Sequence, residues 1–231
     1  MRQIDTILWD VDATLLDFGT SESISLRECL QAYNVEITDE QLAAYKTINR
    51  LYWERFERGE IIKQHVYLHR FVDFFAMIGV QHVPVLDINA AYQRAIGRNF
   101  VVEKHAAETC AALQQQGIRQ YVVSNGSGIA QHAKLDGSGL VHYMQDCFIS
   151  EEMGSEKPNP RFFELCAARI PGYDPAHTMI VGDSLTSDMQ GGNNAGILCC
   201  WFNPQGKAKP AELRIDYDIR DLKEVLAIIE S

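Results

Sequence analysis

The chain has 231 residues, with 46% hydrophobic and 23% charged residues. This composition is ordinary for a folded protein and excludes a disordered chain or a disulfide-stabilised miniprotein. The 31 acidic residues outnumber the 21 basic ones, for a net charge of −10, and no Lys/Arg block interrupts this acidity. Binding to a nucleic acid polymer is therefore not expected, because affinity for a phosphate backbone needs many basic contacts. A small anionic ligand stays possible where a metal, a lysine or a helix N-terminus supplies local positive charge.

Targeting and redox signals favour a cytoplasmic location. The N-terminal residues 1–10 contain no apolar stretch of the kind found in a signal peptide. The longest apolar run, residues 197–202, is far shorter than the roughly 20 residues that cross a bilayer. The six cysteines form no CxxC pair, so we expect reduced thiols in a protein core and no membrane partner.

Short apolar runs recur along the chain and predict a parallel sheet. They cover residues 4–9, 121–123, 147–149, 178–181 and 197–202. From about residue 100 these runs alternate with amphipathic segments, which indicates βαβ units with helices on both faces of the sheet. We expect the run at 4–9 to join the same sheet despite its distance in the sequence. The predicted fold class is therefore α/β, with a doubly wound parallel sheet.

The interval 17–99 lacks clear strands and predicts a four-helix insert. A first helix is expected near 21–33, and a capping box, Thr38-Asp-Glu-Gln41, starts a second that ends near Gly59. A third helix should run to Gly79, and a fourth should follow Pro84. The residues expected to mark the apolar face of the third helix are Ile62, Val66, His69, Val72 and Ala76.

Two carboxylates follow the first apolar run at Asp10 and Asp12. They should emerge at the carboxyl edge of the sheet, where open α/β folds place their ligands. Carboxylates at i and i+2 beside a buried strand favour a bound divalent cation, and Mg²⁺ prefers such oxygen ligands. A polar turn at the end of a strand would explain the same spacing equally well.

Three later signals each follow another apolar run. Ser124-Asn125-Gly126 places a hydroxyl and backbone N–H groups at a strand-to-helix turn, where an anion is stabilised. Lys157 precedes a helix that Pro160 can start, so its ammonium group can reach the edge of the sheet. The segment that begins Gly182-Asp183 and ends at Asp188 adds two more carboxylates at the same edge.

Together and in this order, the four elements resemble the haloacid dehalogenase-like hydrolase superfamily. The family's four motifs are matched by Asp10/Asp12/Thr14, by Ser124, by Lys157 and by Asp183/Asp188. The resemblance covers the whole chain and implies a catalytic core of residues 1–16 and 100–231 with a helical cap of residues 17–99. One departure is Ala13, where many members have glycine. The change stiffens the loop without removing a chemical group.

The resemblance also implies a mechanism and a cofactor. Asp10 would attack phosphorus to form an aspartyl-phosphate, and Asp12 would act as the general acid and base. Mg²⁺ would be held by Asp10, by the backbone carbonyl of Asp12 and by Asp183, with Asp188 orienting metal-bound water or Lys157. The catalytic set is thus Asp10, Asp12, Ser124 and Lys157. Substrate oxygens would be bound by Ser124 and by the backbone of Asn125 and Gly126, and Lys157 would neutralise Asp10 and the phosphate.

Within the family, the run Asp-x-Asp-x-Thr-Leu-Leu-Asp-Phe and the segment Ser-Glu-Glu-x-Gly-x-x-Lys-Pro-Asn are similar to pyrimidine-type 5′-nucleotidases. This similarity implies that the partner is a small phosphorylated metabolite, a nucleoside monophosphate. The protein itself is expected to be a monomer or a homodimer. A sugar-phosphate phosphatase or phosphomutase of the same superfamily stays open, because its core motifs are the same. A phosphate-accepting signalling module of the receiver type is the alternative from another class. Receivers, however, carry the acceptor aspartate on a middle strand and lack a helical insert.

Overall fold

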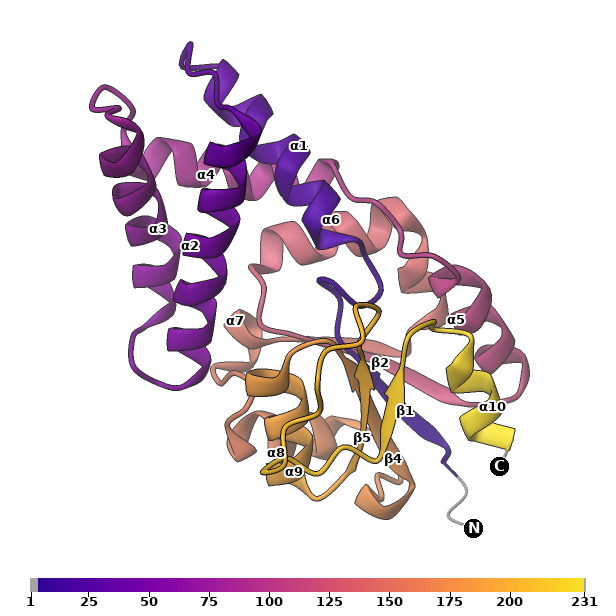
Figure 1. The fold of residues 1–231 in the computed structure, drawn as a ribbon. Helices are drawn as coiled ribbons and strands as arrows, with labels where there is room; N and C mark the ends of the chain where they lie inside the picture. Colours follow the sequence, from indigo (N-terminus) through magenta and orange to yellow (C-terminus); the bar gives the residue numbers. More distant parts are fainter. Residues whose placement is uncertain (1–3, 231) are drawn as a thin grey trace. The chain divides into compact units, whose positions relative to one another are not determined.

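The computed structural model describes residues 4–230. The chain divides into two compact units. One unit comprises Met1–Phe18 and Phe100–Ser231, and the other comprises Gly19–Asn99 (Figure 1). No helix within residues 4–230 combines the length and the apolar character needed to cross a membrane.

The first unit is built on a six-stranded sheet in which every pair of neighbouring strands is parallel. The strands are β1 (Thr6–Trp9), β2 (Arg119–Ser124), β3 (Asp146–Ile149), β4 (Thr178–Gly182), β5 (Leu198–Phe202) and β6 (Tyr217–Ile219). Their order across the sheet is β3-β2-β1-β4-β5-β6. The direction of the chain's progress across the sheet reverses at β1 and β4, and such a switch point is where doubly wound sheets bind ligands.

Helices cover both faces of this sheet (Figure 1). They are α5 (Ala106–Gln115), α6 (Gly128–Ser138), α7 (Ser150–Met153), α8 (Pro160–Arg169), α9 (Gln190–Ala195) and α10 (Glu224–Glu230). On one face Ile7 and Trp9 pack in one apolar core with side chains of α5, α6 and α10. On the other face Leu8 packs with Phe162 and Phe163 of α8. Alternate residues of β1 therefore serve two separate cores, as expected for a strand buried on both sides.

The predicted fold class is confirmed, with differences at element ends. The first strand begins at Thr6 rather than at residue 4, and the last long strand begins at Leu198 rather than at residue 197. The edge strand β6, Tyr217–Ile219, has three residues and is not among the predicted strands. A strand this short has too few residues for a period-2 pattern to stand out from the surrounding loop.

The second unit is a bundle of four helices, α1 (Phe18–Gln31), α2 (Asp39–Glu57), α3 (Lys63–Ile78) and α4 (Val85–Arg98). The capping box before α2 is present: the Gln41 N–H donates to Thr38 Oγ1, and the Thr38 N–H donates to Gln41 Oε1. At the end of α3, Gly79 has φ +72°, a left-handed conformation that glycine adopts without steric cost.

The face of α3 that is buried differs from the predicted one. Val66 is buried as expected, but Ile62 and Val72 are exposed. The buried residues of α3 are instead Val66, Arg70, Phe71, Phe74 and Phe75. The prediction was wrong because apolar residues lie on nearly every side of this helix, so their spacing alone does not identify the buried face.

Arg70 is 1% exposed and lies at the centre of a polar network inside the bundle. Its Nη1 donates to Asn49 Oδ1 at 2.9 Å, and its Nη2 donates to Asn89 Oδ1 at 3.1 Å. Asn49 in turn donates to Glu22 Oε1 at 2.7 Å. The guanidinium carbon also lies 4.8 Å from the ring centroid of Tyr92. A buried charge needs such partners, so this network ties α1, α2, α3 and α4 to one another.

Replacing Arg70 by Met should therefore destabilise the helical unit. The loss of two hydrogen bonds to a charged group, with two amide oxygens left unpaired, should lower its free energy of unfolding by about 2–4 kcal/mol. Urea unfolding followed by circular dichroism measures this change. Arg94 is exposed on α4 and is the matched control: Arg94→Met should stay within about 0.5 kcal/mol of the parent protein. Equal stabilities for the two variants would contradict a structural role for the network.

Candidate active site

Asp10 is the first residue of the site along the chain, and it directly follows the central strand β1. The backbone N–H of Asp10 donates to the carbonyl of Val181 on β4 at 2.9 Å. Its neighbour in sequence, Trp9, is paired with Val122 on β2 and with Val181 on β4. Asp10 therefore lies at the carboxyl edge of the sheet with a strand on either side, at the switch point of the topology.

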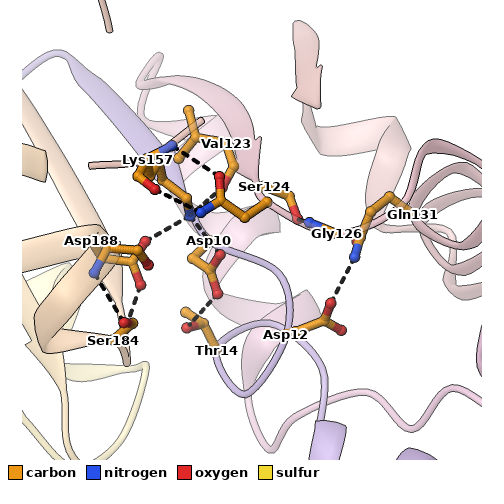
Figure 2. A network of polar contacts seen from close by, with 12 residues as sticks. Asp10, Asp12, Thr14, Val123, Ser124, Gly126, Gln131, Lys157, Ser184 and Asp188 are labelled. Carbon is orange, nitrogen blue, oxygen red and sulfur yellow. Dashed lines mark hydrogen bonds and ion pairs between the residues drawn. The ribbon is translucent and has the colours of Figure 1, made fainter. Parts of the chain in front are cut away.

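Lys157 supplies the positive charge of the site from the loop before α8. Its side chain is 1% exposed. The Nζ atom donates to Asp10 Oδ1 at 2.7 Å, to Asp188 Oδ1 at 2.6 Å and to the carbonyl of Val123 at 2.7 Å (Figure 2). An ammonium group has three N–H donors, so all three are used. The buried cation thus joins two carboxylates that are far apart in the sequence.

The two members of this ion pair shift each other's proton affinity. Burial raises the pKa of Asp10 to about 7, although the Lys157 ammonium group opposes the rise. For Lys157, burial alone would lower the pKa, but the carboxylates of Asp10 and Asp188 raise it above its ordinary value. Lys157 is therefore charged throughout the neutral range. A further cation beside Asp10 would lower the pKa of this carboxyl group and favour its ionised form.

The loop after Asp10 folds back on itself and supports that carboxylate. The N–H groups of Ala13 and Leu16 donate to the carbonyls of Leu16 and Val11, respectively. Thr14 Oγ1 donates to Asp10 Oδ2 at 3.2 Å. Ala13 has φ +64°, a left-handed conformation that costs a residue with a Cβ about 1–2 kcal/mol. This position is therefore one where glycine would be unstrained.

The turn Ser124-Asn125-Gly126 follows β2 and fastens the lysine loop. Asn125 Nδ2 donates to the carbonyl of Lys157 at 2.8 Å, and the Lys157 N–H donates to Asn125 Oδ1 at 2.9 Å. The Gly126 N–H donates to Ser124 Oγ at 3.1 Å. The Asn125 amide thus positions the backbone that carries Lys157, a contact that the sequence analysis did not predict.

The acidic segment after β4 brings two more carboxylates to the same edge. A Cβ on Gly182 would overlap the Asp188 carboxyl group, so only glycine leaves room for that side chain. Asp188 Oδ2 accepts the Ser184 N–H at 3.1 Å. The turn that carries Asp188, Leu185–Met189, is π-helical, a geometry often found at functional sites. Trp201 Nε1 donates to the Asp183 carbonyl at 2.9 Å and fixes the start of this segment.

Asp10, Asp183 and Asp188 form a cluster suited to a divalent metal ion. Each offers a carboxylate oxygen, and these atoms all lie within 4.8 Å of one another. A ligand set made only of carboxylate oxygens suits hard cations such as Mg²⁺ rather than zinc or copper. Two members of the cluster, Asp10 and Asp188, already accept hydrogen bonds from Lys157, whose positive charge offsets part of the negative charge of the cluster.

The side chain of Asp12 points away from this cluster and toward Gln131 on α6 (Figure 2). Lys134 Nζ donates to Asp12 Oδ1 at 2.5 Å, and Gln131 Nε2 donates to Asp12 Oδ2 at 2.6 Å. Lys134 and Gln131 are not among the residues predicted from the sequence to form the site. Their i, i+3 spacing just after the Ser-Asn-Gly turn is a signal that they share one face of the helix, but it does not reveal the carboxylate that they meet.

The structure brings together most of the residues that the sequence singled out. Asp10, Lys157 and Asp188 are in direct contact, Asp183 completes the carboxylate cluster, and Ser124, Asn125 and Gly126 form the adjoining turn. The side chain of Asp12 is separate from the cluster and has partners of its own. The functional role of each of these residues stays a prediction.

Comparisons with known proteins agree with this geometry. Residues 4–196 match the haloacid dehalogenase-like hydrolase family. The chain is 36% identical over 229 residues to the HAD-hydrolase YfnB of Bacillus subtilis (strain 168), covering 99% of this chain and 97% of that protein. It is 30% identical over 224 residues to the pyrimidine 5′-nucleotidase PynA of Streptococcus pneumoniae, covering 97% and 94%.

A solved structure extends the comparison to three dimensions. The crystal structure of the Bacillus subtilis YfnB protein bound to magnesium has a TM-score of 0.94 to this chain at 35% identity. The match covers 99% of this chain and 100% of that chain. The doubly wound sheet with Asp10 at its switch point and the match over residues 4–196 lead to one conclusion. The chain belongs to the haloacid dehalogenase-like hydrolase family.

Proposed function

We propose that this protein is a Mg²⁺-dependent phosphatase that hydrolyses small phosphate monoesters through an aspartyl-phosphate on Asp10, with nucleoside 5′-monophosphates as substrates. The observation that carries the proposal is the buried contact of Asp10 with Lys157 at the carboxyl edge of the central strand. It provides a carboxylate for attack beside a fixed positive charge that would offset part of the negative charge of a phosphate dianion.

The two steps divide between the two aspartates of the first loop. In the first step an Asp10 oxygen bonds to phosphorus, the ester P–O bond breaks, and Asp12 donates a proton to the leaving oxygen. In the second step a water oxygen bonds to phosphorus, the bond from Asp10 to phosphorus breaks, and Asp12 takes the proton of that water. A positioned acid and base contributes about 10²–10⁴ in rate. The separate location of the Asp12 carboxylate supports this division.

The metal would be held by the carboxylates of Asp10 and Asp183, with the Asp12 backbone carbonyl as a further oxygen ligand. Asp188 would take part through Lys157 or as a ligand itself. When bound, Mg²⁺ offsets the repulsion between a carboxylate and a phosphate dianion and polarises the phosphoryl oxygens. The carboxylate cluster fits such an ion, and the magnesium-bound relative supports the choice of metal.

The remaining site residues would hold the phosphoryl group. Lys157 would neutralise charge on the transferring group, and Ser124 with the backbone of Asn125 and Gly126 would bind its oxygens. The Gly126 N–H lies in the turn between β2 and α6, and α6 starts at Gly128. A helix N-terminus at this place favours an anion.

The choice of substrate depends on residues outside these four motifs, because the motifs touch only the phosphoryl group. We assign this choice to the helical cap predicted over residues 17–99. The similarity to PynA, named a pyrimidine 5′-nucleotidase, favours a nucleotide. A sugar-phosphate phosphatase or phosphomutase is the alternative, and a phosphate-accepting signalling module is the alternative that would not turn over. The cytoplasmic location and a monomer or homodimer stay predictions.

Phosphate release across a panel of monoesters tests the proposal. With Mg²⁺ present we expect repeated turnover, with kcat/KM for a pyrimidine nucleoside 5′-monophosphate exceeding that for sugar phosphates by about tenfold or more, a difference of about 1.4 kcal/mol. A preference for sugar phosphates would transfer the assignment to the alternative. Release that stops after a single equivalent would favour the signalling module. No release from any monoester would contradict the proposed function.

Mg²⁺ binding to the free protein should depend on Asp183 and on pH. Titration calorimetry should show weaker binding in Asp183→Asn by about tenfold or more, because one anionic ligand is removed. In the parent protein, Asp10 holds a proton below its pKa of about 7, and Mg²⁺ must displace that proton. Affinity should therefore fall as the pH drops from 8 to 6, by up to about tenfold per pH unit below 7.

The matched control for this titration is Asp136→Asn, since Asp136 is an exposed carboxylate on α6. It should bind Mg²⁺ like the parent protein at both pH values. Equal affinity in Asp183→Asn and the control would show that Asp183 holds no metal.

A further inference from the structure

Two side chains of α6 hold the carboxylate of Asp12, one on each oxygen. Lys134 Nζ lies 2.5 Å from Oδ1 and Gln131 Nε2 lies 2.6 Å from Oδ2. Lys134 is 2% and Gln131 is 1% exposed, whereas the Asp12 side chain retains 27% of its exposure. The two donors are therefore fixed in the protein interior, and the carboxylate between them remains open to a ligand.

Burying a lysine in this way is costly and requires a partner. A charged ammonium group loses its hydration when it is buried, and the loss is offset only by close opposite charge and hydrogen bonds. Asp12 provides that charge, and the ring of Phe18 lies 5.7 Å from Lys134 Nζ. Lys157 contacts Asp10 and Lys134 contacts Asp12, so these two aspartates pair with two different buried lysines.

The glycine of the Ser-Asn-Gly turn makes the Gln131 contact possible. A Cβ on Gly126 would overlap Gln131 Nε2, so any other residue there would displace the amide. Gln131 can meet Asp12 only through its N–H₂ group, because its own carbonyl oxygen would repel the carboxylate. Its Oε1 is buried without a hydrogen-bond partner among the described residues. The hydrogen bond that accounts for the placement of this buried amide is therefore the one from its Nε2 to Asp12.

We infer that Lys134 and Gln131 are positioning residues for proton transfer: they fix the Asp12 carboxylate in the orientation from which it protonates the leaving group. This inference rests on the proposed function. Each carboxylate oxygen has two lone-pair sites, so an oxygen that accepts one hydrogen bond can still carry the transferred proton. The hydrogen bonds from Lys134 and Gln131 restrict rotation of the Asp12 side chain. A displacement of a catalytic group by about 1 Å can lower the rate by about 10²-fold.

The dependence of the rate on the leaving group separates this role from a structural one. An alkyl alkoxide needs a proton as the P–O bond breaks, whereas p-nitrophenolate leaves without one. Lys134→Met should lower kcat/KM for an alkyl phosphate such as the protein's best nucleotide by about 10²-fold, and for p-nitrophenyl phosphate by about threefold or less. Gln131→Met should show the same pattern with a smaller ratio. Asp12→Asn sets the reference for complete loss of the acid.

Two further variants and one stability measurement complete the experiment. Lys134→Arg keeps a charged donor and should recover part of the alkyl-phosphate activity. Lys104→Met removes an exposed lysine of the same unit and should leave both substrates unchanged. Thermal unfolding identifies any variant that does not fold, and if Lys134→Met fails this check, Gln131→Met and Lys134→Arg provide the comparison.

Several results would overturn the inference. Equal loss for both substrates in folded variants would indicate a structural role. A raised KM with unchanged kcat would indicate that Lys134 binds substrate directly. If the parent protein hydrolyses neither substrate, the proposed function itself fails, and that result is seen before any variant is made.

Discussion

The ammonium group of Lys157 is the constraint on which the site depends. It is buried and donates to three acceptors that arrive from three different strands: Asp10 after β1, Val123 on β2 and Asp188 after β4. A buried charge with fewer partners would be strongly unfavourable. The lysine therefore needs the parallel strands to end at one edge. In return it draws together carboxylates that would otherwise repel each other.

The two aspartates of the first loop are adjacent in the sequence but separated in their partners. Ala13, between them, has a left-handed backbone conformation, and the loop closes on itself through the carbonyls of Val11 and Leu16. Asp10 is consequently held by Lys157, while Asp12 is held by Lys134 and Gln131. In the proposed mechanism, this division would leave Asp10 to react with the phosphoryl group and Asp12 to protonate the leaving group. A single carboxylate cannot act as nucleophile and as general acid from one position.

The sequence predicted the parallel sheet and the family correctly because those signals are local. An apolar run followed by a polar residue can be recognised within about ten residues, and the capping box at Thr38 is defined by four. The meeting of Asp10, Lys157 and Asp188 at one edge then followed from the parallel topology.

The features that were missed depend on contacts distant in sequence or on side chains that break the usual rules. Lys134 lies 122 residues from Asp12, and nothing in its own neighbourhood marks it as buried. Arg70 is a charged residue on the buried face of α3, a place that apolar periodicity does not assign to an arginine. In both cases a long-range polar contact outweighs the intrinsic preference of the residue for water.

The central claim is that Asp10 carries the phosphoryl group during turnover. Rapid acid quenching of the protein with Mg²⁺ and a nucleotide, followed by borohydride reduction, converts an aspartyl-phosphate to homoserine, which peptide mass spectrometry locates. We expect homoserine at residue 10 of the parent protein. Continued phosphate release with unmodified Asp10, or with phosphate found on Ser124, would contradict the claim.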